Sequence, residues 1–209
     1  MKTPDAFYKN EAFLKGFLEK AKKNNFSEFI RLEKALFHFS KDVDFLVYKN
    51  SLVDFLYENT VNSDYVTYVE KLERNIAVYP GSFNPFTTGH YSILEKAEKI
   101  FDKVIIAFGN NADKKNEKYE IPQAIMNRQI EHYDGLITSF LDKLGYETTL
   151  IRGLRNASDF YYEINLERCL KDENRNIKFV SIFCDAEFEH VSSSVSRQYE
   201  KFGKKMYRI

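Results

Sequence analysis

The sequence predicts an α/β domain built on a parallel sheet, preceded by an all-helical N-terminal extension. Up to about Arg74, apolar and aromatic residues recur at helical spacing, and Gly16 is the only glycine. Beyond that point, strand-like apolar runs alternate with helical ones, and glycines mark the junctions. Strands that are separated by helices form parallel sheets with right-handed crossovers. We therefore expect two domains, at residues 1–73 and 74–209.

The N-terminal extension is expected to consist of helices only. The Thr-Pro-Asp run at 3–5 is typical of a helix start, since proline suits the first turn and an acid suits the positive end of the helix dipole. Ser27 is the expected cap of a second helix, and residues 44–57 and 64–72 are the expected third and fourth. The aromatic stripe favours a helical core or docking face over a binding groove.

The second domain is expected to alternate short apolar strands with helices. The expected strands are residues 76–79, 103–108, 148–151 and 177–183, and the expected helices are 90–101, 122–144, 158–170 and 193–202. Gly203 is placed to end the last helix. Ligands of such sheets bind beyond the carboxyl ends of the strands, so the side chains that follow each strand are the candidate site.

Composition excludes several classes of protein. Lys and Arg total 31, as do Asp and Glu, so the chain has no overall field for gripping nucleic acid or an anionic membrane. No apolar run approaches the roughly 20 residues that span a bilayer, and residues 1–10 lack a secretory signal. We expect a cytoplasmic protein. Cys169 and Cys184 each lie in an apolar run and are expected to be reduced core thiols.

The first strand is followed by the string YPGSFNPFTTGH, which ends at His90. Pro80 and Gly81 are expected to end the strand, and Ser82 offers a hydroxyl to a phosphate. Gly89 lets the backbone approach a ligand, and His90 opens a helix whose free N–H groups and positive dipole suit a phosphate. A glycine-rich turn with an incidental histidine is the alternative on spacing alone.

Basic side chains follow the next strands. Lys114 and Lys115 lie in a polar turn after the second strand, where one can reach a phosphate as a point charge, although a solvated pair is the alternative. The string RGLRNASDFYYE follows the third strand and contains Arg152 and Arg155, whose planar guanidinium groups suit phosphate oxygens. A basic turn balanced by an acid at the helix start is the alternative.

The last two helices carry further candidates. Ser158 or Asp159 is the expected cap of the helix after the arginines, and Glu163 lies one turn further on. The string HVSSSVSR follows the last strand and places three serines at a helix start, where they cap it and still have groups left for phosphates.

Together these strings resemble a known family. The G-x-F-x-P-x-T/H-x-G-H signature of the adenylyl- and cytidylyltransferase superfamily is filled at every fixed position, by Gly81, Phe83, Pro85, Thr87, Gly89 and His90. The arginine string resembles the RGLR-x-x-x-D-F-x-Y-E motif of phosphopantetheine adenylyltransferases. The serines resemble the I-S-S-S motif of that family, with Val191 in place of isoleucine. The motifs occur in family order over about 75–209.

The resemblance implies a Rossmann-like nucleotidyltransferase fold that transfers an adenylyl group from ATP to 4'-phosphopantetheine, with Mg2+ held mainly by ATP phosphates and no protein metal ligand. It also implies a homo-oligomer. The implied catalytic residues are His90, Lys114, Arg152 and Ser82, of which the last three bind the acceptor. The implied ATP-binding residues are Gly81, Phe83, His90, Arg155, Glu163, Ser192, Ser193 and Ser194.

Three departures from the family pattern leave the acceptor open. Segment 115–152 is shorter than usual and is expected to lack a strand. Cys169 and Leu170 stand where the family has Met-Asn facing the pantetheine arm, and the helical extension has no counterpart. Two alternatives therefore remain: an adenylyltransferase for another phosphorylated acceptor, such as nicotinamide mononucleotide, and a non-catalytic nucleotide-binding protein.

Overall fold

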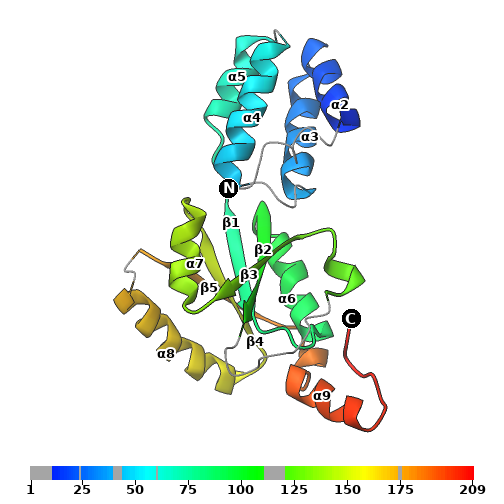
Figure 1. Ribbon diagram of the computed structural model, residues 1–209, viewed down its shortest axis with the longest axis vertical. Coiled ribbons are helices and arrows are strands. Elements are labelled where there is room, and N and C mark those ends of the chain that lie inside the picture. The colour runs from blue at the N-terminus through cyan, green and yellow to red at the C-terminus, as the bar shows by residue number, and fades with distance from the viewer. Residues whose placement is uncertain (1–10, 24, 40–43, 60, 111–120, 174–175) are drawn as a thin grey trace. The chain divides into compact units, whose positions relative to one another are not determined.

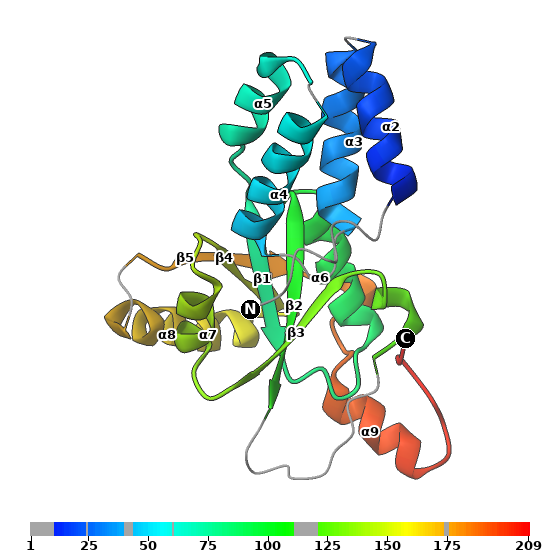
Figure 2. The same ribbon diagram turned by 45° about the horizontal axis from the view of Figure 1, so that its top comes forward.

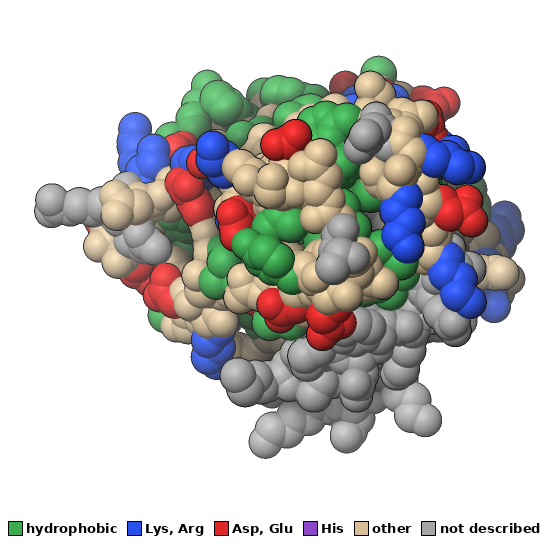
Figure 3. All heavy atoms as spheres, turned by 90° about the horizontal axis from the view of Figure 1, so that it is seen from above, with side chains coloured by type: hydrophobic (Ala, Val, Ile, Leu, Met, Phe, Trp, Pro, Cys, Tyr) green, Lys and Arg blue, Asp and Glu red, His purple; other side chains and the backbone are tan. Residues whose placement is uncertain are grey.

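The computed structural model (Figures 1 and 2) divides into two compact units, Met1–Arg74 and Asn75–Ile209. The residues that it describes are 11–23, 25–39, 44–59, 61–110, 121–173 and 176–209. No described helix is long and apolar enough to cross a membrane. On the face in Figure 3, Lys and Arg side chains are interspersed with Asp and Glu rather than gathered by sign.

The first unit is helical, as predicted. Its described helices are α2 (Glu11–Lys22), α3 (Phe26–Phe39), α4 (Phe45–Glu58) and α5 (Ser63–Glu70). The prediction that Ser27 caps α3 is wrong, because Asn25 precedes the helix and its Oδ1 accepts the Glu28 N–H at 3.2 Å. Asp44 caps α4 with its carboxylate. The helix start predicted at 3–5 lies outside the described residues.

A buried ion pair lies in the aromatic core of this unit. The side chains of Glu33 and Arg74 are 0% and 5% exposed and form a salt bridge, and Tyr48 Oη donates to Glu33 Oε1 at 3.0 Å. The Arg74 guanidinium also lies over the Phe37 ring, 5.7 Å from its centroid. Phe29 and Phe37 are fully buried, so the aromatic stripe serves as core.

The second unit is an α/β domain with five parallel strands in the order β3-β2-β1-β4-β5. The strands are β1 (Ile76–Gly81), β2 (Lys103–Asn110), β3 (Gln129–Asp134), β4 (Thr149–Leu154) and β5 (Lys178–Phe183). The helices are α6 (Thr88–Glu98), α7 (Ile137–Leu144), α8 (Ala157–Glu173) and α9 (Ser193–Lys201), with short 3-10 turns η1 (Gln123–Ile125) and η2 (Ala186–Phe188). Helix α6 covers one face of the sheet, and α7 and α8 lie on the other (Figures 1 and 2).

Strand β3 corrects two expectations. Residues 122–144 were expected to be helical, and a strand of the family fold was expected to be missing, but Gln129–Asp134 pairs with β2 along its full length. Gly135 then turns the chain with a φ of 79°. An edge strand pairs on one side only and tolerates polar side chains, so QIEHYD lacks the apolar run that predicts a strand.

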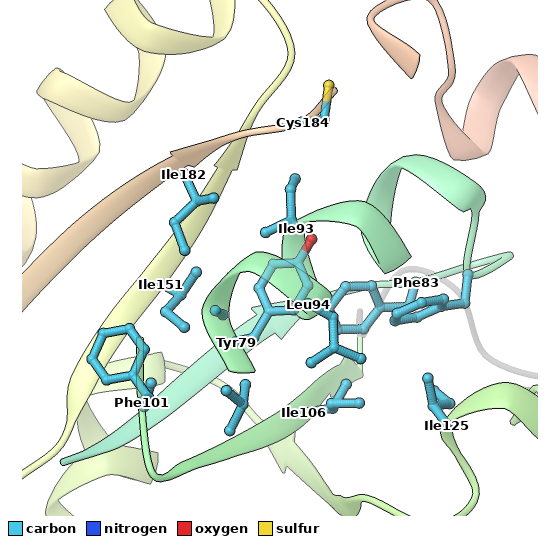
Figure 4. Packing of buried hydrophobic residues seen from close by; sticks show 14 of the residues in the cluster. Tyr79, Phe83, Ile93, Leu94, Phe101, Ile106, Ile125, Ile151, Ile182 and Cys184 are labelled. Atoms are coloured by element: carbon cyan, nitrogen blue, oxygen red, sulfur yellow. The ribbon is translucent and has the colours of Figure 1, made fainter. Parts of the chain in front are cut away.

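The core of the domain lies between α6 and the central strands. Ile93 and Leu94 of α6 pack against Tyr79, Ile106 and Ile151 (Figure 4). Cys184 belongs to this cluster, as predicted for a core thiol. Cys169 is exposed, so the same prediction is wrong there. Leu170, its neighbour, is buried, because adjacent residues on a helix point in different directions.

Replacing Arg74 by methionine would leave the Glu33 carboxylate buried without its cation. We expect the free energy of unfolding of the N-terminal unit to fall by about 3–5 kcal/mol, the range for breaking a buried ion pair. Urea denaturation measures this loss. Arg31→Met is the matched control, because Arg31 pairs with Glu28 at the surface and should contribute little. An equal loss of unfolding free energy in Arg74→Met and Arg31→Met would contradict the claim that burial makes the Arg74–Glu33 pair stabilising.

Candidate active site

A cavity of about 430 Å³ opens at the carboxyl ends of β1 and β4. It is lined by every described residue for which a site role was expected, namely Gly81, Ser82, Phe83, His90, Arg152, Arg155, Glu163, Ser192, Ser193 and Ser194. Lys114 and Lys115 lie outside the described residues. From β1 the chain crosses to β2 on one side, and from β4 it crosses to β5 on the other, so the cavity lies at the topological switch point of the sheet.

The sheet itself makes room for this cavity. β1 pairs with β4 only at Ala77 and Val78, whereas it pairs with β2 through Pro80 and Gly81. β1 therefore ends at Gly81, two residues beyond its predicted end at Tyr79, and Pro80 and Gly81 belong to the strand. Proline is tolerated in a strand where no ladder partner needs its N–H, and at Pro80 β1 pairs on one side only.

Phe83 forms part of the cavity wall and packs in a group of rings. Its ring centroid lies 5.0–5.1 Å from those of Tyr79, Phe86, His90 and Phe108. Phe83 has a φ of 42°, in the left-handed region that non-glycine residues rarely adopt. A Cβ on Gly81 would lie 2.7 Å from the Phe83 ring, so glycine is required for this approach.

His90 is the third residue of α6 and not its first, because Thr87 is the N-cap. The Thr87 N–H donates to His90 Nδ1 at 3.0 Å, and Thr87 Oγ1 accepts the His90 N–H at 3.4 Å. A backbone N–H can only donate, so Nδ1 must be the unprotonated nitrogen. The proton of the neutral ring is therefore on Nε2, which Thr87 leaves available as a donor.

The environment of His90 keeps the imidazole uncharged. Burial, and secondarily the positive charge of Arg155, lowers the pKa of His90 from 6.5 to about 4. The ring is therefore neutral at physiological pH and acts as a hydrogen-bond donor rather than as a cation. The helix start also has fewer free donors than expected, since the Thr88 N–H is bonded to the carbonyl of Tyr207.

Each of the two predicted arginines is held by a carboxylate from α8. Arg152 belongs to β4, which extends three residues beyond its predicted end at Ile151. Its Nε and Nη2 donate to Glu163 Oε2 and Oε1 at 2.8 and 2.9 Å. Arg155 donates in the same way to Asp159, at 2.7 Å from both Nε and Nη2. Both guanidinium groups are thereby oriented before any ligand binds.

These pairs give two acids of α8 a partner within the protein. The buried carboxylate of Glu163, which the resemblance assigns to the ATP site, faces Arg152. Hydrogen bonding from Arg155 lowers the pKa of Asp159, which therefore stays ionised. Neither Ser158 nor Asp159 caps α8, because Asn156 Oδ1 accepts the N–H groups of both residues.

The serine motif is largely engaged within the protein. Ser192 caps α9 by accepting the Val195 N–H at 3.2 Å, and its hydroxyl lies 3.0 Å from that of Ser194. Ser193 Oγ donates to the carbonyl of Pro85 at 2.9 Å, so α9 holds the loop that bears the histidine signature.

Arg197 lines the cavity and was missed by the sequence interpretation. Its guanidinium donates to the carbonyl of Asn84. Arg197 is the last residue of the HVSSSVSR string and lies four residues after Ser193. On a helix this spacing places both side chains on the same face, so the position of Ser193 in the motif predicts that Arg197 also faces the site.

Residues 78–198 match the cytidylyltransferase-like family. Together with the parallel sheet and the cavity at its switch point, this match defines the chain as a nucleotidyltransferase.

Curated relatives identify the family within this class. The phosphopantetheine adenylyltransferase of Clostridium beijerinckii is 38% identical over 137 residues, which are 61% of this chain and 86% of that protein. Those of Rhodopirellula baltica and Cytophaga hutchinsonii are 36% and 37% identical over 66% and 61% of this chain, and 82% and 90% of their own lengths. The chain belongs to the phosphopantetheine adenylyltransferase family.

Solved structures resemble the chain more distantly. A bifunctional NMN adenylyltransferase/ADP ribose pyrophosphatase from Francisella tularensis has a TM-score of 0.42 and 19% identity, over 65% of this chain and 45% of that one.

The low pKa of His90 predicts a pH dependence of stability. Between pH about 4 and 6.5 the unfolded chain binds a proton at this position that the folded chain does not. Stability should therefore decrease as the pH falls through this window and should be insensitive to His90 above it. Urea midpoints at a series of pH values measure the effect.

His90→Gln should lose part of this pH dependence, while His38→Gln, in the N-terminal unit, should leave the transition of the second unit unchanged. If the urea midpoint changed with pH equally in His90→Gln and in the unsubstituted chain, the low pKa of His90 would be contradicted.

Proposed function

We propose that this chain transfers the adenylyl group of ATP to 4'-phosphopantetheine, giving dephospho-coenzyme A and pyrophosphate. One observation carries the proposal: a neutral histidine and three arginines line a single cavity at the switch point of the sheet. The names of the curated relatives support the choice of acceptor.

The reaction suits these residue types. A phosphate oxygen of the acceptor attacks the α-phosphorus of ATP in line, and the bond from that phosphorus to the pyrophosphate oxygen breaks. The attacking oxygen is already anionic, so no protein nucleophile is required. The protein must align two anions that repel each other and stabilise the charge that develops between them.

Arg152 and Arg155 add oriented hydrogen-bond donors to the cavity rather than net positive charge. Each is paired with a carboxylate, so each pair is neutral as a whole. The bidentate pairs leave Nη1 of both arginines without a protein hydrogen bond in the described part of the chain, and these groups suit phosphate oxygens. Arg197 adds a cation that has no carboxylate partner among the described contacts.

His90 is proposed to donate its Nε2–H to the α-phosphoryl group. The Thr87 N–H already occupies Nδ1, and the low pKa keeps the ring neutral, so the donor is in place at physiological pH. A fixed donor aimed at developing charge needs no reorganisation during the reaction.

The remaining assignments rest on the resemblance. We propose that Ser82, which is exposed in the cavity, and Lys114 contact the acceptor phosphate, and that Gly81, Phe83 and the three serines contact ATP. Mg2+ would enter with the ATP phosphates. The described residues contain no group of three metal-ligating side chains, and the cavity carboxylates Asp159 and Glu163 are committed to arginines.

We also propose that the chain is a cytoplasmic homo-oligomer in which residues 1–73 are an appendage of the transferase domain at 74–209. Two neighbouring aromatic residues on α8 support self-association, since Phe160 and Tyr161 are 43% and 71% exposed and their ring centroids lie 6.4 Å apart. The balanced charge of the chain supports the absence of a nucleic-acid partner.

An acceptor panel tests the proposed reaction. Pyrophosphate release from ATP and Mg2+ is measured with phosphopantetheine, nicotinamide mononucleotide and pantetheine, and we expect release with phosphopantetheine only. Release with nicotinamide mononucleotide instead would mean that the acceptor pocket has been rebuilt. ATP binding without pyrophosphate release with any of the three acceptors would favour the non-catalytic alternative.

His90→Ala tests the histidine. Removing one donor to a developing oxyanion costs about 10²–10³ in kcat, and we expect a loss of this size without a large change in the KM for ATP. His38→Ala is the matched control, because His38 lies in the other unit and should leave kcat unchanged. Near-normal turnover of His90→Ala would exclude the proposed role.

A further inference from the structure

Residues 204–209, here called the strap, leave α9 and return to the loop that precedes His90 (Figure 2, red). The Thr88 N–H donates to the carbonyl of Tyr207 at 2.9 Å, and the Ile209 N–H donates to the carbonyl of Phe86 at 3.4 Å. The strap therefore binds residues 86–88, which precede His90, through backbone hydrogen bonds on both sides of Thr87.

Thr87 and Arg208 are partners in an isolated antiparallel bridge. In a bridge whose ladder bonds belong to the flanking residues, the N–H and C=O of the central residue point away from the partner strand. The contacts of Thr87 agree with this geometry, since its N–H donates to His90 Nδ1 and its carbonyl accepts the Tyr91 N–H at 3.0 Å. Thr87 is 1% exposed, so water does not compete for these groups.

The strap is in turn anchored to the α9 region. Ser196 is fully buried, and its Oγ donates to the carbonyl of Met206 at 2.9 Å. The Tyr207 hydroxyl lies 3.1 Å from His190 Nε2. Tyr207 has a φ of 63°, a left-handed conformation that persists in a non-glycine residue only when its surroundings enforce it.

We propose that the strap is a positioning element for His90: by clamping residues 86–88 it aims the Thr87 N–H at Nδ1 and so keeps the ring proton on Nε2. Thr87 and Tyr207 are then positioning residues, because they act on the substrate only through the imidazole. The effect on catalysis rests on the proposed function of His90 as a donor. The effect on the imidazole does not, and it is measurable without substrate.

Two substitutions at one position separate the backbone of the strap from its side chain. Tyr207→Pro fixes φ near −65°, which is incompatible with the left-handed conformation, and should release the strap. Tyr207→Gly adopts a positive φ freely and retains the carbonyl that Thr88 binds, so it is the matched control.

The readout is the 15N NMR spectrum of the histidine rings in the full chain at neutral pH, with His90 assigned by its loss in His90→Gln. We expect an Nε2–H tautomer in the unsubstituted chain and in Tyr207→Gly. Tyr207→Pro should show a mixture of tautomers, and its kcat for pyrophosphate release should fall by about 10² with little change in the KM for ATP.

The wild-type tautomer and kcat in Tyr207→Pro would overturn the proposal. If that variant loses its fold by circular dichroism, Ile209→Pro is the second variant, because proline has no N–H to donate to the carbonyl of Phe86. The wild-type tautomer in Ile209→Pro overturns the proposal equally. A shifted tautomer in a chain that releases no pyrophosphate would support the strap and contradict the proposed function.

Discussion

The early end of pairing between β1 and β4 is the constraint on which the site depends. Two central strands that paired along their whole length would leave no room between their carboxyl ends. Here the ladder stops at Val78 and Leu150, while β1 continues along β2 to Gly81. The crevice at the switch point receives the loop that follows β1 and leads to His90. It also receives Arg152 of β4 and Arg155, the residue directly after β4, so residues far apart in the sequence share one cavity.

Packing and electrostatics are coupled at His90. The aromatic group around Phe83 excludes water from one side of the imidazole, and the nearby Arg155 adds a positive charge, so protonation of the ring is unfavourable. Thr87 occupies one of the two ring nitrogens. Burial that stabilises the domain therefore also fixes the protonation state and tautomer of the group proposed to meet the phosphate.

Helix α8 orients both arginines through two of its carboxylates. Asp159 and Glu163 lie four residues apart, on one face of the helix, and each forms a bidentate pair with an arginine from the end of β4. Such pairs restrict the rotamers of long side chains before a ligand arrives. They also neutralise charge that would otherwise repel within a partly buried cavity.

The sequence by itself determined the α/β class, the apolar central strands and the short strings that carry the family resemblance. Each of these depends on residues close together in the chain. Tertiary structure alone decided that the polar segment Gln129–Asp134 is an edge strand, that Glu163 faces Arg152, and that the proton of His90 lies on Nε2. Pairing along a sheet edge joins segments that are remote in sequence. Glu163 and Arg152 lie 11 residues apart, and Thr87 and His90 only three, but which of their groups face each other depends on how β4, α8 and the start of α6 are placed in the folded domain. A string of residues does not encode that placement.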